Sequence, residues 1–282
     1  MRIGVGIPNS HPSASGALLL ECARRAEAGG LSRLATIGRV AYPSHEELVS
    51  LAAAAAATTR IGLMTNVMLG PARDPVLLAK QAATLDRLSQ GRFVLGAGVG
   101  NRPDDFAATG TAFHDRGRRW DDALELMHAA WRGEEVHGAE HPVAPRPTHD
   151  ERVPMVFGGG GDRAVARVVR WGVGYTASGG ADRVGPMFAR VRAAWADAHR
   201  DGSPTCFALA YFALGPDADR GRDYLVHYYG EMGEMIWSGV PHDAAAIRES
   251  MAAHERIGAD ELVFVPTLAD ADQVDRLAEA VR

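Results

Sequence analysis

Eight short apolar runs alternate with helical patterns along nearly the whole 282-residue chain, and this alternation constrains the fold more than any other feature. The runs are close to continuously apolar, as in parallel strands that are covered on both faces. Eight strand and helix units in about 280 residues favour a closed (β/α)8 TIM barrel, with an open doubly wound sheet as the alternative. The expected strands are Ile3–Ile7, Leu34–Ile37, Ile61–Leu69, Phe93–Ala97, Met155–Phe157, Val173–Ala177, Cys206–Leu214 and Leu262–Val265.

Two of the intervening helices have clear ends. Asp74 and Pro75 are a cap residue and a proline at the first helical position, and the apolar face that follows ends before a glycine. A second pattern runs from about Arg118 to Arg132 and stops at Gly133. We expect both helices to pack on the barrel, and residues 1–282 to form one domain.

Three stretches are longer than the minimal repeat needs: 101–117, 134–153 and 224–237. Active sites of such barrels lie at the carboxyl ends of the strands, so we expect these insertions to form lids and substrate walls there. The third stretch is rich in tyrosine and methionine, and it suits equally a helix that packs on its own apolar face.

The charge and the composition of the chain argue against nucleic-acid binding and membrane insertion. The net charge is −5 and charges of both signs are scattered, which argues against a nucleic-acid groove. The longest apolar run, Leu51–Ala57, is too short to cross a bilayer, and the first residues lack the apolar region of a secretory signal. With only two cysteines, we expect a cytoplasmic protein without a membrane partner.

Several reaction classes lack the residues they need. The histidines show no zinc-ligand spacing, so no metal is expected. Neither a Gly-x-Ser-x-Gly elbow nor a Walker loop is present. Lys80 is the only lysine, so a Schiff-base aldolase would have to use it.

Two glycine-rich strand ends are the strongest candidates for binding. The first closes the run Gly91–Gly100, where Asn101 occupies the position of the third glycine of a dinucleotide fingerprint. Such an end lets a flat ring or a phosphate approach the backbone, although a tight turn would use the same glycines. The second is Gly158-Gly159-Gly160-Gly161-Asp162-Arg163 before a helical pattern, which predicts an anion site rather than a linker. Ser178-Gly179-Gly180 is a weaker case of the same kind.

Polar residues interrupt the third apolar run at Thr65-Asn66-Val67. Each polar group needs a hydrogen-bond partner if it is buried. A ligand edge and a satisfied structural pair explain the interruption equally well.

Taken together, these segments resemble the bacterial luciferase-like monooxygenase family. The resemblance is carried by 21–30, 59–63, 74–89, 91–100, 116–131, 158–161 and 257–263. It implies a (β/α)8 barrel, a homodimer, and reduced FMN or coenzyme F420 at the carboxyl mouth, with the phosphate at the loop 158–161. It also implies a non-prolyl cis peptide at Asn66–Val67 under the flavin ring, bordered by Gly98, Val99, Gly100 and Asn101.

Two departures from the family pattern affect the choice of cofactor. Ile37-Gly38-Arg39 stands where many deazaflavin members have Asp-His, and Val99 stands where luciferase has an arginine that helps to hold the FMN phosphate. We expect reduced FMN and keep coenzyme F420 as the alternative. Gly38 is a further cofactor-binding candidate. Arg39 is a candidate partner for flavin or substrate, and an exposed structural arginine explains it equally well.

The expected reaction is oxygenation of a small organic substrate by reduced FMN and dioxygen, with a separate flavin reductase as a supplier. The cofactor then does most of the chemistry, and the protein supplies position and exclusion of water. His11 and His114 are candidates for proton transfer. Alternatives are hydride transfer with coenzyme F420, a flavin-binding protein without turnover, and a phosphate-binding barrel isomerase or aldolase. The run Ala52–Ala57 is expected at a dimer interface.

Overall fold

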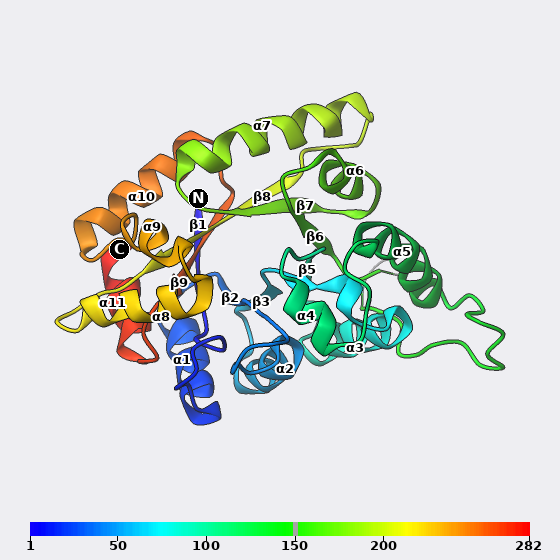
Figure 1. Ribbon diagram of the computed structural model, residues 1–282, viewed down its shortest axis with the longest axis horizontal. Helices are drawn as coiled ribbons and strands as arrows, with labels where there is room; N and C mark the ends of the chain where they lie inside the picture. Colours follow the sequence, from blue (N-terminus) through cyan, green and yellow to red (C-terminus); the bar gives the residue numbers. More distant parts are fainter. Residues whose placement is uncertain (149–151) are drawn as a thin grey trace.

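The structure is a computed structural model that describes residues 1–148 and 152–282. At its centre parallel strands form a closed ring, with helices outside it (Figure 1). The strands follow the order β3-β2-β1-β9-β8-β7-β6-β5, and β3 pairs with β5 to close the ring. The predicted TIM barrel is therefore confirmed. Strand bounds are β1 Arg2–Gly6, β2 Arg33–Thr36, β3 Gly62–Thr65, β4 Met68–Leu69, β5 Phe93–Gly98, β6 Met155–Gly158, β7 Gly174–Ser178, β8 Thr205–Phe212 and β9 Glu261–Pro266.

The third expected strand is two strands. β3 ends at Thr65 and β4 begins at Met68, and the Asn66–Val67 peptide bond between them is cis, as the resemblance implied. Asn66 and Val67 therefore leave the strand ladder at the carboxyl end of β3, at the mouth of the barrel.

The helices of the repeating units cover the outside of the ring, and the two clearest sequence patterns are confirmed. Asp74 caps α3 by accepting a hydrogen bond from the backbone amide of Leu77, and α5 ends at Gly133, whose φ is +76°. None of the helices formed by the described residues is long and apolar enough to cross a membrane. Helix bounds are α1 Gly16–Ala28, α2 Glu47–Ala57, α3 Pro75–Leu88, α4 Pro103–Ala108, α5 Arg116–Arg132, α6 Asp162–Trp171, α7 Ala181–Asp197, α8 Gly221–Tyr229, α9 Met232–Trp237, α10 Ala244–Arg256 and α11 Asp272–Ala280.

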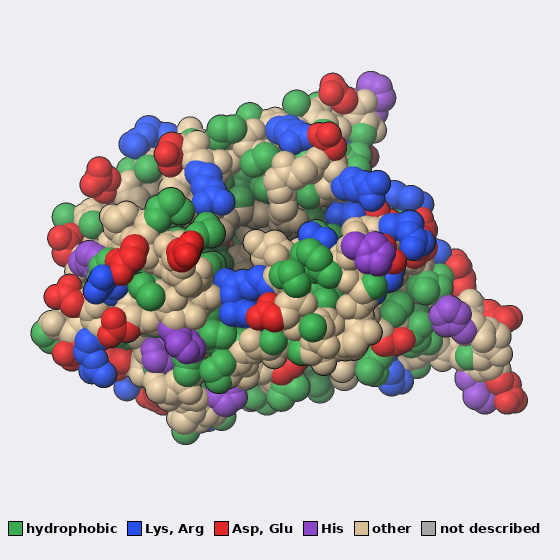
Figure 2. Space-filling model, viewed as in Figure 1, with side chains coloured by type: hydrophobic (Ala, Val, Ile, Leu, Met, Phe, Trp, Pro, Cys, Tyr) green, Lys and Arg blue, Asp and Glu red, His purple; other side chains and the backbone are tan. Residues whose placement is uncertain are grey.

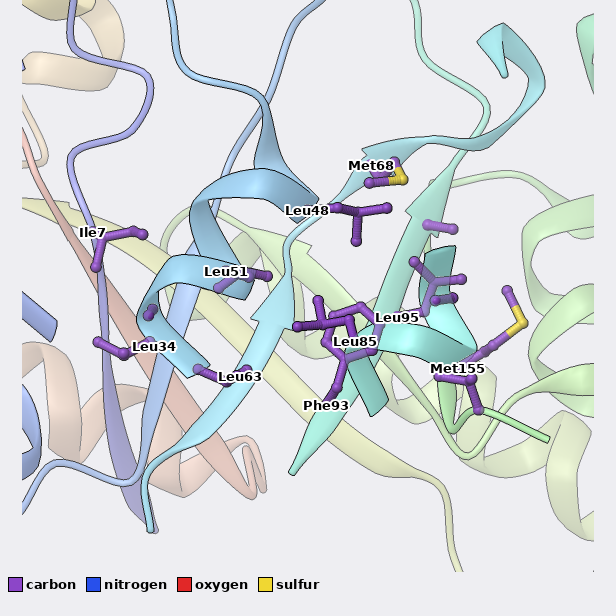
Figure 3. Packing of buried hydrophobic residues seen from close by; sticks show 14 of the residues in the cluster. Ile7, Leu34, Leu48, Leu51, Leu63, Met68, Leu85, Phe93, Leu95 and Met155 are labelled. Atoms are coloured by element: carbon purple, nitrogen blue, oxygen red, sulfur yellow. The ribbon is translucent and has the colours of Figure 1, made fainter. Parts of the chain in front are cut away.

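The main hydrophobic core lies between the ring and the helices. Outward-facing side chains of the strands, such as Leu34, Leu63 and Phe93, meet Leu51 of α2 and Leu85 of α3 (Figure 3). All five are fully buried or nearly so. This packing holds the strands in place from outside, so the interior of the barrel does not have to be filled along its whole length.

The interior is filled at the amino end and hollow at the carboxyl end. At the bottom Arg33 pairs with the fully buried Glu261, with 3.2 Å between Nε and Oε1. Met64, Val156 and Phe207 form the next layer. The layer above contains Gly98 and Gly158, which supply no side chains, so a hollow opens there.

Two of the three predicted insertions lie at the mouth, and the prediction for the third is wrong. The stretch 101–117 forms α4 and the loop after it, and 224–237 contributes to α8 and α9. The described part of 134–153 connects α5 to β6 and therefore lies at the amino end of the barrel, beyond α5 in Figure 1. There the Lys80 ammonium donates to the Ala144 carbonyl. Length identifies an insertion, but its place between a helix and the next strand decides which end it occupies. Residues 149–151 lie outside the described residues.

Candidate active site

Two adjoining cavities open at the carboxyl ends of the strands. We name the larger, of about 560 Å³, the glycine cavity, because Gly98 and Gly158–Gly160 line it. The smaller, of about 260 Å³, is the tyrosine cavity, lined by Tyr211, Tyr228 and Tyr229 among others. Figure 2 shows the hollow in this face, with basic side chains between α8 and α4. Both cavities share Asn66, Val67, Gly100, Asn101, Ser178 and Leu209.

The Val67 side chain explains why glycines end β5 and β6. A Cβ atom at Gly98 would lie 3.0 Å from Val67 Cγ2, and one at Gly158 would lie 3.5 Å from both Val67 methyl groups. Side chains at these positions would press on Val67 and fill the floor of the glycine cavity. The glycines therefore keep backbone surface accessible to a ligand.

The glycine cavity is suited to an anion. Its lining includes Gly158–Gly160, Arg116 and Arg183, and among the residues that the structure describes it includes no acidic one. The amino ends of α6 and α7 follow directly, so their dipoles add positive potential. Arg116 is fixed in place, because its Nε donates to the Gly100 carbonyl at 2.9 Å and its guanidinium stacks 3.8 Å from the Phe113 ring centroid.

Asn66, at the junction of the two cavities, carries a buried donor without a partner. Its Oδ1 accepts a hydrogen bond from Thr176 Oγ1 at 2.8 Å, and its backbone amide donates to the Thr36 carbonyl at 2.7 Å. Its Nδ2 is buried and has no partner within the part of the chain that the structure describes. Since unsatisfied buried amides are rare, this one indicates a ligand acceptor. Thr65 differs, because its buried hydroxyl donates to the Gly96 carbonyl at 2.8 Å and is purely structural.

The tyrosine cavity combines aromatic walls with hydroxyl and guanidinium donors. The Tyr211 and Tyr229 hydroxyls lie 2.7 Å apart. Burial raises the pKa of both phenols, so both are protonated at neutral pH. Arg39 and Arg102 stand over the Tyr228 ring, 5.9 and 5.0 Å from its centroid. The cavity therefore favours a ligand with a hydrogen-bond acceptor or a negative charge.

Most of the cofactor and ligand candidates from the sequence meet in these cavities. Gly38, Arg39, Asn66, Val67, Gly98, Val99, Gly100, Asn101, Gly158, Gly159, Gly160 and Ser178 line one or both. The lining of neither cavity includes Thr65, Gly161, Asp162, Arg163 or Gly179. Asp162 forms an ion pair with Arg190 instead, and the Arg163 side chain is exposed.

Sequence reasoning missed Arg102, Arg116 and Arg183 as cations of the site. For Arg183 a signal existed, since it follows Gly179-Gly180 at the start of a helix much as Arg163 follows Gly160-Gly161. Arg102 and Arg116 gave none, because their place depends on contacts with backbone that the sequence does not reveal.

Neither candidate histidine lies in the two cavities. His11 borders a separate cavity of about 780 Å³, where its ring stacks on Tyr224 with 5.0 Å between centroids. Burial and the nearby Arg220 lower the pKa of His11, so its ring is neutral at neutral pH. His114 is exposed in the loop before α5. Lys80 lies on the outer helix α3, so the barrel interior offers no amine for Schiff-base chemistry.

Comparison with known proteins identifies the family. The family model described as luciferase-like monooxygenase matches residues 1–276. An uncharacterised protein of Mycobacterium tuberculosis is 32% identical over 218 residues, which cover 73% of this chain and 74% of that protein. An F420-dependent secondary alcohol dehydrogenase, in complex with an F420-acetone adduct, has a TM-score of 0.82 at 17% identity and is matched over 100% of this chain and 99% of its own. The oxygenating constituent of 3,6-diketocamphane monooxygenase of Pseudomonas putida, in complex with FMN, has a TM-score of 0.77 at 15% identity, over 99% and 96% of the two chains. The chain therefore belongs to the luciferase-like monooxygenase family and is an oxidoreductase.

Proposed function

We propose that this oxidoreductase uses reduced FMN and dioxygen to oxygenate a small organic substrate. The observation that carries the proposal is the buried, unpartnered Nδ2 of Asn66, at the junction between a basic cavity and an aromatic one. A phosphorylated flavin has an anionic tail at one end and a flat ring with hydrogen-bond acceptors at the other. The anionic tail suits the basic glycine cavity, and the flat ring suits the junction with the tyrosine cavity.

The residues present fit the cofactor group by group. The phosphate, with roughly two negative charges, would lie against the Gly158–Gly160 backbone beside Arg116 and Arg183. The ring would lie over Asn66 and Val67, where Asn66 Nδ2 would donate to one of its acceptors. The substrate would enter the tyrosine cavity beside the ring.

The mechanism divides between cofactor and protein. When bound, reduced flavin would supply the electrons that activate dioxygen. The protein orients the ring through Asn66 and excludes water with the Tyr228 and Leu209 side chains. The protonated Tyr211 and Tyr229 hydroxyls hold a proton beside the substrate, where they can stabilise a developing negative charge on its oxygen.

The proposal also covers the association of two copies of the chain and the source of the reduced FMN. Residues 1–282 act as one domain, and a separate reductase delivers the reduced FMN. Two copies associate through α2 and α3, whose exposed faces carry Val49 and Leu77, 70% and 53% exposed. Ala54 and Ala55 of the alanine run are buried against the core of their own chain, so they contribute to that interface less than these two residues do.

Anaerobic titration with reduced FMN, riboflavin and coenzyme F420 tests the cofactor, and admission of dioxygen tests the reaction. The proposal expects reduced FMN to bind more tightly than riboflavin, which lacks the phosphate, and expects the bound form to consume dioxygen. Preferred binding of coenzyme F420 would replace oxygenation by hydride transfer. Binding without dioxygen consumption or substrate oxidation would indicate a flavin-binding protein without turnover. If none of the three compounds binds, both the FMN-dependent and the F420-dependent reactions are refuted.

A further inference from the structure

One guanidinium of the tyrosine cavity has no acidic partner in the described part of the chain. Arg102 directly precedes α4, and its Nη1 donates to the Tyr228 carbonyl at 2.7 Å. Its guanidinium carbon lies 5.0 and 5.4 Å from the ring centroids of Tyr228 and Tyr229. Among the residues that the structure describes, no carboxylate oxygen lies within 4.0 Å of its nitrogens. A partly buried cation without a counter-ion is unfavourable, so an anion that enters the cavity would be held strongly.

The neighbouring acidic groups are already engaged. Arg39 donates to the Asp104 carboxylate, and its Nε lies 3.8 Å from Asp105 Oδ2. Asp105 Oδ1 also accepts the backbone amides at positions 40 and 41, each at 2.8 Å. Arg39 is therefore fully engaged by two carboxylates, and the two backbone amides stabilise the charge of Asp105, which also lines the cavity. Of the two guanidinium groups in the lining, Arg102 is the one that has no carboxylate within 4.0 Å among the described residues.

The remaining walls limit the size and shape of the ligand. The cavity of about 260 Å³ is smaller than the roughly 300–1,000 Å³ that drug-sized ligands occupy. Leu69, Leu209 and the ring of Tyr228 give it flat apolar sides. In the Tyr211 and Tyr229 pair one hydroxyl donates to the other, which leaves one O–H for a second acceptor on the ligand.

We propose that the tyrosine cavity binds a small single-ring organic acid, with its carboxylate paired to Arg102 and its ring against Tyr228. That this acid is the substrate rests on the function proposed above, whereas the chemistry of binding rests on the cavity alone. A carboxylate fits better than a phosphate, because one planar guanidinium matches it and Arg39 is already engaged.

A purely structural Arg102 is the competing explanation. Its hydrogen bond to the Tyr228 carbonyl satisfies the last turn of α8, so its loss would also loosen that helix. A loosened helix would lower the binding affinities of charged and neutral ligands alike. The ratio of two affinities therefore separates the roles, since only a direct ion pair distinguishes a carboxylate from an isosteric amide.

Calorimetric titration of the full chain with benzoate and with benzamide provides this ratio. We expect the unchanged protein to prefer benzoate by about ten-fold or more, Arg102→Gln to reduce the preference to about two-fold or less, and Arg102→Lys to keep part of it. Arg183→Gln, at the other end of the site, is the matched control and should leave the ratio unchanged. Equal affinities for the two probes in the unchanged protein, an undiminished preference in Arg102→Gln, or no binding of either probe would each overturn the proposal.

The same titrations with and without FMN separate this inference from the proposed function. A benzoate preference in a chain that binds no flavin would support the anion site and refute the flavin proposal. Flavin binding without a benzoate preference would refute the anion site alone.

Discussion

Replacing Arg183 by glutamine should weaken FMN binding without affecting riboflavin. Arg183 lines the glycine cavity, and the described residues of that lining include no acidic partner for it. Hydrogen bonds to charged groups contribute about 1.5–3 kcal/mol, whereas exposed ion pairs contribute about 0.2–1 kcal/mol. Because the Arg183 side chain is exposed yet faces a phosphate position shared with Arg116, we expect a loss of about 1.5 kcal/mol, or about ten-fold in Kd.

Arg163→Gln is the matched control for this prediction. Arg163 is also an arginine at the start of a helix after a glycine pair, but its side chain is exposed and outside the cavity lining. Fluorescence titration of both variants with FMN and with riboflavin gives four affinities. Only the FMN affinity of Arg183→Gln should fall, and the fall should shrink at high salt because the site is open to solvent. If Arg163→Gln loses FMN affinity and Arg183→Gln does not, the assignment of the phosphate end is wrong.

The remaining predictions concern stability and assembly. Burial raises the pKa of Glu47 to about 7 despite its ion pair with Arg73, so the folded state binds that proton more tightly than the unfolded state. The protonated Glu47 therefore stabilises the fold fully below about pH 4.5, and this stabilisation is lost as the pH rises to about 7. Glu47→Gln should flatten the fall of the melting temperature across this interval. A pH profile of the melting temperature that does not change in this variant would contradict the prediction. Gly96→Ala should lower the free energy of unfolding by about 3 kcal/mol or more, since its Cβ would lie 1.8 Å from the backbone carbonyl oxygen of Thr65, the last residue of β3. Gly160→Ala, with no atom within 4 Å of the new Cβ, is the control in urea unfolding, and similar losses in both would refute the argument. The double change Val49→Glu with Leu77→Glu should yield monomers in sedimentation, whereas Met235→Glu, at a similarly exposed position on α9, should leave the proposed dimer intact. A dimer that survives the double change would exclude the α2 and α3 face as its interface.

The sequence was sufficient to predict the barrel and the glycines that line the candidate site. Continuous apolar runs specify buried parallel strands whatever their neighbours are, so eight of them predicted the ring. The glycines at 98 and 158–160 were also recognisable, because a strand end without side chains has a local signature. The alternation of strand and helix then placed both glycine segments at the same end of the barrel.

The rest of the site depends on contacts between distant residues. The unpartnered Nδ2 of Asn66 follows from Thr176, 110 positions away, which fixes the other end of the amide. The position of Arg102 follows from Tyr228, 126 positions away. For the same reason the sequence did not distinguish Thr65, whose hydroxyl is bonded within the barrel, from Asn66, which lines both cavities, although the two are adjacent.

A crystal structure of the chain soaked with FMN would show whether the two cavities hold the flavin. We expect a flavin ring against Asn66 and Val67 with Asn66 Nδ2 hydrogen-bonded to it, and a phosphate on the Gly158–Gly160 backbone beside Arg183. A phosphate bound elsewhere, for example in the cavity that His11 borders, or a ring that leaves Asn66 Nδ2 without a partner, would contradict it.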